Sequence, residues 1–215
     1  MNLPPEQRHP IMCLTREGGA SGPVEQARLL CEAGARWVQL RMKEAMPEAW
    51  LSTAKQVVGV CHDFGALCIV NDSVLIAIAS GADGVHLGRH DMDWGHARRM
   101  LGPKKLMGGT VNDEEDAARA VASGSLDYAG VGPLRFTGTK QKLAPLLGAE
   151  GIGRLIERLG GLPAWAIGGV RPEDLPALRA TGASGVAVCA ALYGEPSVKS
   201  NYDAFAKAWE RNFPI

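Results

Sequence analysis

A short run of polar side chains in this chain is suited to binding an anion at a strand end. The segment Gln39-Leu40-Arg41-Met42-Lys43 directly follows the apolar pair Trp37-Val38. Alternate side chains of a β-strand share one face, so Gln39, Arg41 and Lys43 are expected to emerge side by side where the strand ends. Two cations and an amide that converge in this way favour an anionic ligand. For an isolated Arg-x-Lys a solvated strand end would be the better interpretation, and the rest of the chain decides between the two.

Two aspartates follow the next two predicted strands. Asn71-Asp72 ends one apolar segment, and Asp91 lies just after the next. Mg²⁺ is commonly held by one or two carboxylates together with substrate phosphate oxygens, so this pair suits a magnesium ion that arrives with a diphosphate. Either aspartate alone would more simply cap the helix that follows it. As neighbours beside Arg41 and Lys43, they favour the metal interpretation.

Later loops offer groups that bind phosphate oxygens. Thr137, Thr139 and Lys140 lie in a loop too long and too rich in glycine and threonine for a simple joint, although a flexible surface loop is the alternative. Gly168-Gly169 and Cys189-Ala190 follow the last two predicted strands, where barrels often bind a phosphate through backbone amides. Glycines also simply turn chains, so Gly168-Gly169 alone is a weak signal.

Histidine and cysteine placement predicts no covalent chemistry. His86 lies inside a strand pattern and is expected to be packed or hydrogen-bonded within the fold rather than to act as a base. No Ser/His/Asp or Cys/His arrangement stands out. The five cysteines are widely spaced and include no Cys-x-x-Cys pair, so neither a zinc site nor a disulfide framework is predicted.

Eight short apolar segments predict the strands that position these side chains. They are residues 11–15, 37–40, 67–70, 84–87, 105–108, 128–131, 164–168 and 185–188. Stretches with helical spacing, such as 24–33 and 50–61, lie between them. Four similar joints, each with a glycine just past a helical stretch, lead into the next strand: Gly34, Gly81, Gly124 and Gly182.

Strand and helix alternate without a linker, so residues 1–215 are predicted to form a single α/β domain, a (β/α)8 TIM barrel. Such barrels more typically run to roughly 250 residues. A doubly wound open sheet is the alternative, and it is weakened because no Gly-x-Gly-x-x-Gly follows the first strand.

Composition excludes several classes of function. The 215 residues include 23 basic and 23 acidic side chains, so no global field would attract nucleic acid or an anionic membrane. The longest apolar runs are too short to span a bilayer, and the N-terminus lacks the apolar core of a signal peptide. We therefore expect a cytoplasmic protein that acts on small molecules. A homo-oligomer is compatible with the sequence, which does not set the oligomeric state.

Several motifs occur in one order along the chain. They are Gln39-x-Arg41-x-Lys43, Ile69-Val70-Asn71-Asp72, Gly84-Val85-His86-Leu87-Gly88 with Asp91, Gly130-Val131-Gly132-Pro133 with Thr137-x-Thr139-Lys140, and Ile167-Gly168-Gly169-Val170. Together they resemble the thiamine-phosphate synthase family, from about the second strand to the eighth.

The resemblance implies a (β/α)8 transferase that joins the two halves of thiamine. In that family 4-amino-5-hydroxymethyl-2-methylpyrimidine diphosphate loses diphosphate in the presence of Mg²⁺, and the nitrogen of the thiazole phosphate takes its place. The residues implied for the pyrimidine diphosphate are Gln39, Arg41, Lys43, Asn71, Thr110 and Lys140, of which Arg41, Lys43 and Lys140 would be catalytic. Those implied for the thiazole phosphate are Thr137, Thr139, Gly168, Gly169, Cys189 and Ala190. Asp72 and Asp91 would hold the Mg²⁺.

A few positions depart from the family pattern. They are Met42 for a glutamate, Arg89-His90 for Gln-Glu, Arg135-Phe136 for Phe-Pro, and Ala190 for a serine. The diphosphate and metal side stays intact, whereas the thiazole pocket changes. Arg135 is a candidate to supply the phosphate contacts that Ala190 lacks.

Two rival functions stay open. A thiazole tautomerase has the same barrel but needs neither cations that bind a diphosphate nor a pair of aspartates that holds Mg²⁺. Such a protein would be expected to lose Arg41, Lys43, Asp72 or Asp91. A non-catalytic regulatory protein that binds thiamine phosphates would act through a partner. The sequence shows no interaction segment or exposed apolar helix that supports this second rival.

Overall fold

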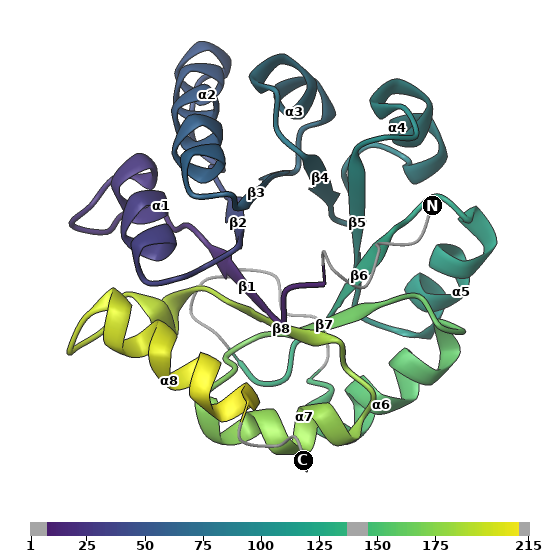
Figure 1. The fold of residues 1–215 in the computed structure, drawn as a ribbon. Coiled ribbons are helices and arrows are strands. Elements are labelled where there is room, and N and C mark those ends of the chain that lie inside the picture. The colour runs from purple at the N-terminus through teal and green to yellow at the C-terminus, as the bar shows by residue number, and fades with distance from the viewer. Residues whose placement is uncertain (1–7, 137–145, 211–215) are drawn as a thin grey trace.

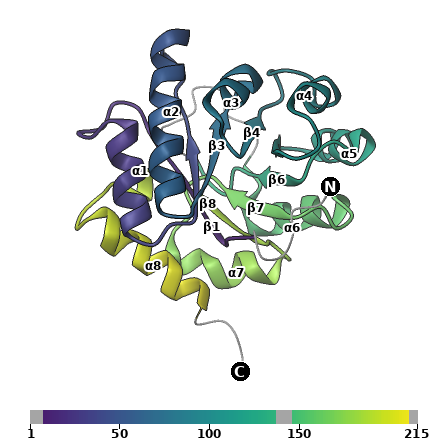
Figure 2. The ribbon, with the colours of Figure 1, turned by 45° about the horizontal axis from the view of Figure 1, so that its top comes forward.

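Eight parallel strands close into a barrel, and helices surround it (Figures 1 and 2). The computed structural model describes residues 8–136 and 146–210. The strands are β1 (Ile11–Leu14), β2 (Trp37–Leu40), β3 (Leu67–Asn71), β4 (Gly84–Leu87), β5 (Leu106–Val111), β6 (Tyr128–Val131), β7 (Ala164–Ile167) and β8 (Gly185–Val188). Each pairs with the next, and β8 pairs with β1. The predicted (β/α)8 barrel is therefore confirmed.

The helices follow the strands in strict alternation. They are α1 (Pro23–Glu32), α2 (Pro47–Asp63), α3 (Val74–Ser80), α4 (Trp94–Leu101), α5 (Glu114–Ser123), α6 (Gly148–Arg158), α7 (Leu175–Ala180) and α8 (Val198–Glu210). Two 3₁₀ turns, η2 (Pro172–Asp174) and η3 (Ala190–Leu192), follow β7 and β8. α8 packs between α7 and α1, which closes the helical ring (Figure 1).

The four predicted glycine joints lie where helices end. Gly34, Gly81, Gly124 and Gly182 have φ angles of 105°, 79°, 57° and 85°. This left-handed region is open to glycine without a Cβ penalty, and it lets the chain leave the helix and turn toward the next strand. The chain thus uses the same joint four times between a helix and the next strand.

β5 is longer than the apolar pattern predicts. The predicted segment ended at residue 108, but the strand continues through Gly109 and Thr110 to Val111. Glycines normally weaken a strand, but a Cβ on Gly108 would lie 2.2 Å from the ring of Tyr128 on β6. Gly108 is therefore needed inside the barrel, and Thr110 is a strand residue rather than a loop residue.

Large rings fill the barrel interior. Trp37, Tyr128 and Trp165 pack together with ring centroids 4.9 to 5.7 Å apart, in tilted and edge-on arrangements. Met12 joins the same buried cluster. We call this cluster of Trp37, Tyr128, Trp165 and Met12 the aromatic plug. Because the plug is apolar and dense, a ligand can be bound only at the polar ends of the strands.

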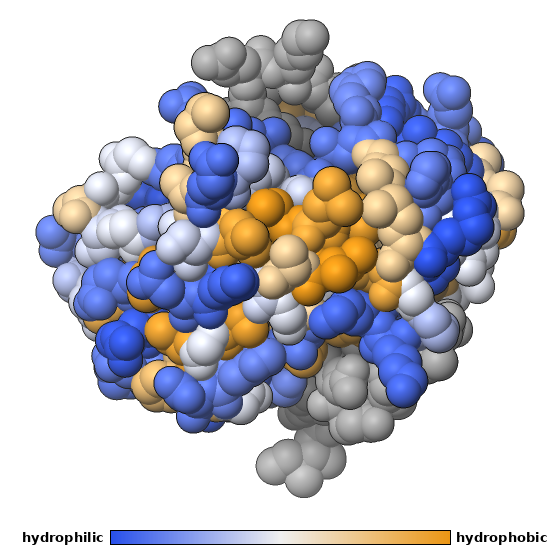
Figure 3. Space-filling model, turned by 90° about the horizontal axis from the view of Figure 1, so that it is seen from above, coloured by the Kyte–Doolittle hydropathy of each residue, from blue (hydrophilic) through white to orange (hydrophobic). Residues whose placement is uncertain are grey.

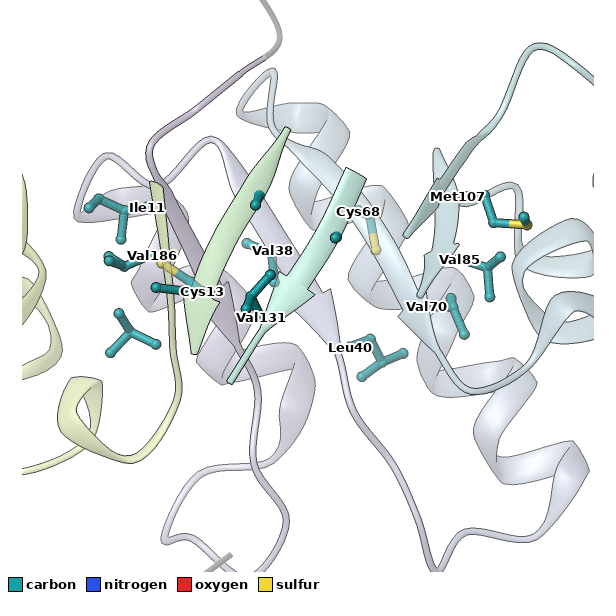
Figure 4. Close-up of a cluster of buried hydrophobic side chains, with 14 of the residues drawn as sticks. Ile11, Cys13, Val38, Leu40, Cys68, Val70, Val85, Met107, Val131 and Val186 are labelled. Carbon is teal, nitrogen blue, oxygen red and sulfur yellow. The ribbon is translucent and has the colours of Figure 1, made fainter. Parts of the chain in front are cut away.

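The other face of each strand packs against the helices. Figure 4 shows this second layer, in which Cys13, Val38, Val70 and Val85 alternate with the interior residues. Burial on both faces explains why the strands read as nearly continuous apolar runs in the sequence.

One helix exposes an apolar face. On α3, Leu75 is 63% exposed and Ile78 41% exposed, and Figure 3 shows a hydrophobic area in the middle of the face seen from above. The expectation that no apolar helix is exposed is therefore wrong. α3 has seven residues, almost all apolar, so its sequence has no polar positions that would distinguish the outer face from the inner one.

No helix in the described ranges is long and apolar enough to cross a membrane.

Candidate active site

Polar residues form the upper layer of the barrel interior, above the aromatic plug. Gln39 is only 3% exposed, and its Nε2 lies 3.4 Å from the Met12 sulfur. Asn71, the last residue of β3, is buried and pairs in register with His86 of β4. Gln39, Arg41 and Lys43 therefore do not emerge at one level, because Gln39 lies deeper inside the barrel.

His86 connects this layer across three strands. Its Nε2 lies 3.0 Å from Thr110 Oγ1, and its Nδ1 lies 3.3 Å from the Tyr128 hydroxyl. Both ring nitrogens thus have partners, as expected for a hydrogen-bonded barrel residue. Thr110 is held at the rim of the barrel by this contact.

Loop backbone after β1 and β2 sets the position of the two cations. The Arg41 amide donates to Thr15 Oγ1 at 3.0 Å, and the Lys43 amide donates to Glu17 Oε2 at 2.9 Å. Sequence reasoning missed Thr15 and Glu17. They lie at alternate positions after the first strand, as Arg41 and Lys43 do after the second, and that spacing is the signal that could have found them.

Asp72 and Asp91 lie side by side at the ends of β3 and β4. Burial of Asp72 and its contact with the Asp91 carboxyl raise the pKa of Asp72 to about 6, against the opposing effects of Lys43 and Arg41. The Lys43 Nζ lies 3.6 Å from Asp72 Oδ2. Two carboxyls in contact, with cations beside them, favour a further positive charge between them.

Neither aspartate caps a helix. Ser73 accepts the Ile76 amide at the start of α3, and Asp93 accepts the His96 amide at the start of α4. The capping alternative therefore fails for both predicted metal ligands. Asp91 instead accepts the Gly88 amide at 2.6 Å, which holds its own loop.

The carboxylate pair fits a hard divalent cation. Within the described part of the chain, no group of three or more His, Cys, Asp or Glu side chains could hold a metal. Mg²⁺ needs fewer protein ligands than that, because it keeps several waters and takes phosphate oxygens from its substrate. Asp72 and Asp91 are the residues that could hold it.

Gly168 and Gly169 form a tight turn after β7. Their φ angles are 103° and 65°, and a Cβ on Gly168 would lie 2.7 Å from Pro133. The Arg135 amide donates to the Gly168 carbonyl at 3.0 Å, so the β6 loop lies directly against this turn. Bare backbone at the mouth of the barrel is suited to the approach of an anion.

Arg135 is not available for phosphate contacts. Its guanidinium donates to both carboxylate oxygens of Asp174, at 2.6 and 2.7 Å, and to the Gly169 carbonyl at 2.7 Å. The candidate role that the sequence suggested for Arg135 is therefore wrong. The side chain instead fastens the β6 loop to the turn that follows β7.

A second arginine–aspartate contact, which we call a clamp like that of Arg135 with Asp174, holds the loop that carries Asp91. Arg89 donates to Asp116 at 2.8 Å and also to Asp113, at the start of α5. Both carboxylates raise the pKa of Arg89. Sequence reasoning missed this contact, because Arg89 lies in the loop after β4 whereas its partners lie at the start of α5.

At the end of β8, the Cys189 thiol donates to the Thr15 carbonyl at 3.8 Å, and Ala190 begins η3. The chain thus places Gly168, Gly169, Cys189 and Ala190 at the ends of the adjacent strands β7 and β8. Thr137, Thr139 and Lys140 lie outside the described residues.

Fold and site together define a (β/α)8 enzyme whose strand ends carry paired carboxylates, cations and bare backbone suited to phosphorylated substrates. The family model for thiamine monophosphate synthase matches residues 11–192. The chain therefore belongs to the thiamine monophosphate synthase family, which is a family of transferases.

Relatives and solved structures agree with this assignment. The chain is 43% identical over 177 residues to the thiamine-phosphate synthase of Bacteroides fragilis, covering 80% of this chain and 86% of the relative. It is 38% identical over 183 residues to that of Chlorobium phaeobacteroides, covering 85% and 88%. The thiamine phosphate pyrophosphorylase structure from Pyrococcus furiosus matches with a TM-score of 0.85 and 29% identity, covering 95% of this chain and 97% of that one. These likenesses support thiamine-phosphate synthase function.

Proposed function

We propose that the enzyme condenses 4-amino-5-hydroxymethyl-2-methylpyrimidine diphosphate with thiazole phosphate, releasing diphosphate and forming thiamine phosphate. The observation that carries the proposal is the meeting of Asp72 and Asp91 beside Lys43 and Arg41 at adjacent strand ends. A diphosphate that binds with a divalent cation needs carboxylates for the metal and cations for its remaining charge.

Stabilisation of the departing diphosphate is the main task of the protein in this reaction. The aminopyrimidine ring can delocalise positive charge at its exocyclic methylene, so the carbon-oxygen bond can break before the thiazole attacks. Arg41, Lys43 and Lys140, together with Mg²⁺ held by Asp72 and Asp91, amount to roughly +3, about the charge that balances a diphosphate of roughly −3. When bound, Mg²⁺ would neutralise charge that develops on the diphosphate oxygens.

No general base is required, because the thiazole nitrogen attacks with a free lone pair. The environment of His86 agrees with this, since both of its ring nitrogens are engaged by Thr110 and Tyr128. Gln39, Asn71 and Thr110 would bind the pyrimidine end of the first substrate within the polar layer above the plug. Thr137, Thr139, Gly168, Gly169 and the backbone of Cys189 and Ala190 would bind the thiazole phosphate.

Diphosphate release by the purified chain tests the proposal. With both substrates and Mg²⁺, we expect diphosphate and thiamine phosphate to form in equal amounts, and excess EDTA to stop the reaction until Mg²⁺ is restored. Omission of either substrate is the control. If the chain only isomerised the thiazole phosphate without releasing diphosphate, it would be a tautomerase, and binding without turnover would indicate the regulatory alternative.

A further inference from the structure

The cations at the strand ends differ in whether they have an anionic partner. Four of them have one: Lys43 with Asp72, Arg89 with Asp113 and Asp116, Arg135 with Asp174, and Arg171 with Glu173. Within residues 8–136 and 146–210, no carboxylate pairs with Arg16 or Arg41. The charge of Arg41 acts on Asp72. Arg16, two residues after the end of β1, is therefore the cation that has neither a carboxylate partner nor an assigned ligand.

The backbone of Arg16 is held firmly. Gln26, buried on α1, accepts the Arg16 amide through Oε1 at 2.8 Å and donates from Nε2 to the Arg16 carbonyl at 2.9 Å. The same Nε2 donates to the Ser21 carbonyl at 2.7 Å, which fixes the rest of the loop. A buried glutamine that satisfies both backbone groups of one residue orders that residue before any ligand binds.

The Arg16 side chain is half-buried but incompletely satisfied. Its guanidinium carbon lies 5.3 Å from the centre of the Tyr193 ring. Its Nε is buried and makes no hydrogen bond within the described ranges. A buried donor without a partner is costly, and a guanidinium is a preferred group for bidentate recognition of phosphate.

Several contacts place Arg16 beside the end of β8. β1 and β8 pair from Ile11↔Val186 to Cys13↔Val188. The Tyr193 hydroxyl donates to the Leu14 carbonyl at 2.9 Å, so the residue that follows η3 lies over the end of β1. Burial raises the pKa of the Cys189 thiol, and the positive charges of Arg41 and Arg16 oppose that rise, so both guanidinium groups act at the end of β8.

We propose that Arg16 binds the phosphate group of the second substrate, the phosphomonoester that the end of β8 receives. This inference rests on the proposed function and adds a residue to the site that is proposed for the thiazole phosphate. The chain has Ala190 where a hydroxyl could otherwise donate to that phosphate, and Arg135 is committed to Asp174. Arg41 also acts at the end of β8, but the proposed function assigns it to the diphosphate, so Arg16 is the remaining described cation that can balance a phosphate near η3.

Steady-state kinetics of Arg16→Met and Arg16→Lys test the inference. We expect Arg16→Met to raise KM for the thiazole phosphate at least about tenfold, and to change KM for the pyrimidine diphosphate less than about twofold. Arg16→Lys should recover part of the loss, because a point charge remains without the bidentate geometry. Arg28→Met, which removes an exposed arginine from α1, is the matched control and should behave as wild type.

The dephosphorylated thiazole alcohol separates phosphate binding from a structural role. With the alcohol as second substrate, wild type and Arg16→Met should have the same kcat/KM within about twofold. An equal loss with phosphate and alcohol, or no loss with either, overturns the inference.

Titration calorimetry with thiazole phosphate keeps the test independent of turnover. If wild type binds the thiazole phosphate but forms no product, the proposed function fails while the inference about Arg16 is still decided by the affinity of Arg16→Met. Unchanged affinity in that variant refutes the inference, and an affinity at least about tenfold weaker supports it.

Discussion

Asp72→Asn is expected to make the protein more stable and nearly inactive. Asp72 is the one described residue other than glycine with a positive φ, at 68°, and asparagine tolerates this left-handed conformation as well as aspartate does. Asparagine also keeps the shape of the side chain. The substitution therefore removes the charge and little else.

The size of the stability gain follows from the pKa of Asp72. It is raised from 3.8 to about 6 in the folded protein, by burial first and by Asp91 second. Ionisation of Asp72 above pH 6 thus costs the folded state up to about 3 kcal/mol, at about 1.4 kcal/mol per unit. Partial exposure, the shared titration with Asp91 and the lost Lys43 contact reduce this, and we expect a gain of about 1–2 kcal/mol.

The sign of the pH dependence is specific. A carboxyl with a raised folded pKa contributes full stability below its unfolded pKa of 3.8, and this contribution is lost as the pH rises through about 6. Asp72→Asn and wild type should therefore melt at similar temperatures near pH 4. Near pH 7.5 without Mg²⁺, the variant should melt about 3–6 °C higher.

Thermal unfolding at several pH values, followed by activity with Mg²⁺, measures both effects. We expect turnover of Asp72→Asn to fall by at least about 100-fold. Asp72→Ala is the control, since it loses the same charge but carries a left-handed alanine that costs about 1 kcal/mol. A variant that melts at or below the wild-type temperature at pH 7.5, or whose difference does not change with pH, would refute the reasoning.

Two further substitutions test the loops after β6 and β7. Gly168→Ala, which places a Cβ 2.7 Å from Pro133 at a φ of 103°, should lower the free energy of unfolding by at least about 2 kcal/mol in urea titrations. If Gly168→Ala were as stable as wild type, the turn would have to relax around the added Cβ, and the prediction would be wrong. Arg135→Met, which leaves the Asp174 carboxylate with the Arg171 amide but no guanidinium partner, should cost about 1–3 kcal/mol in the same titrations and raise KM for the thiazole phosphate. Unchanged stability and KM would show that the clamp does not order this turn.

The barrel could be predicted because its strands are buried on both faces. Each predicted apolar segment overlaps an observed strand, since a strand between the aromatic plug and the helices must be apolar throughout. β5 departs most from its predicted length. The glycines at 108 and 109 resemble a turn in the sequence. Only their neighbours in space explain why they continue a strand: the ring of Tyr128 leaves no room for a Cβ at Gly108, and Leu126 and Trp94 leave none at Gly109.

Site residues could be predicted by position but not by contact. The sequence predicts Asp72, Asp91, Arg41 and Lys43 just after strands, and the structure has them there, because a closed parallel barrel gathers all its strand ends at one mouth. Which cation pairs with which carboxylate depends on how separate loops meet in space. The clamp from Arg135 to Asp174 joins residues 39 positions apart, and no local pattern marks it.

Several features of the mouth destabilise the ligand-free protein, and those that come from unbalanced charge would be relieved by a charged ligand. Asp72 has a positive φ and its carboxyl touches that of Asp91, while Arg16 and Arg41 have no carboxylate partner within the described residues. The first pair favours a cation, and the two arginines favour anions. Because both signs occur around one mouth, a metal-bound diphosphate and a phosphomonoester would together satisfy them. Strained backbone and unpaired charges persist in a folded protein when the rest of the fold is stable enough to keep them in place. Here the barrel and the arginine–aspartate contacts between its loops do so.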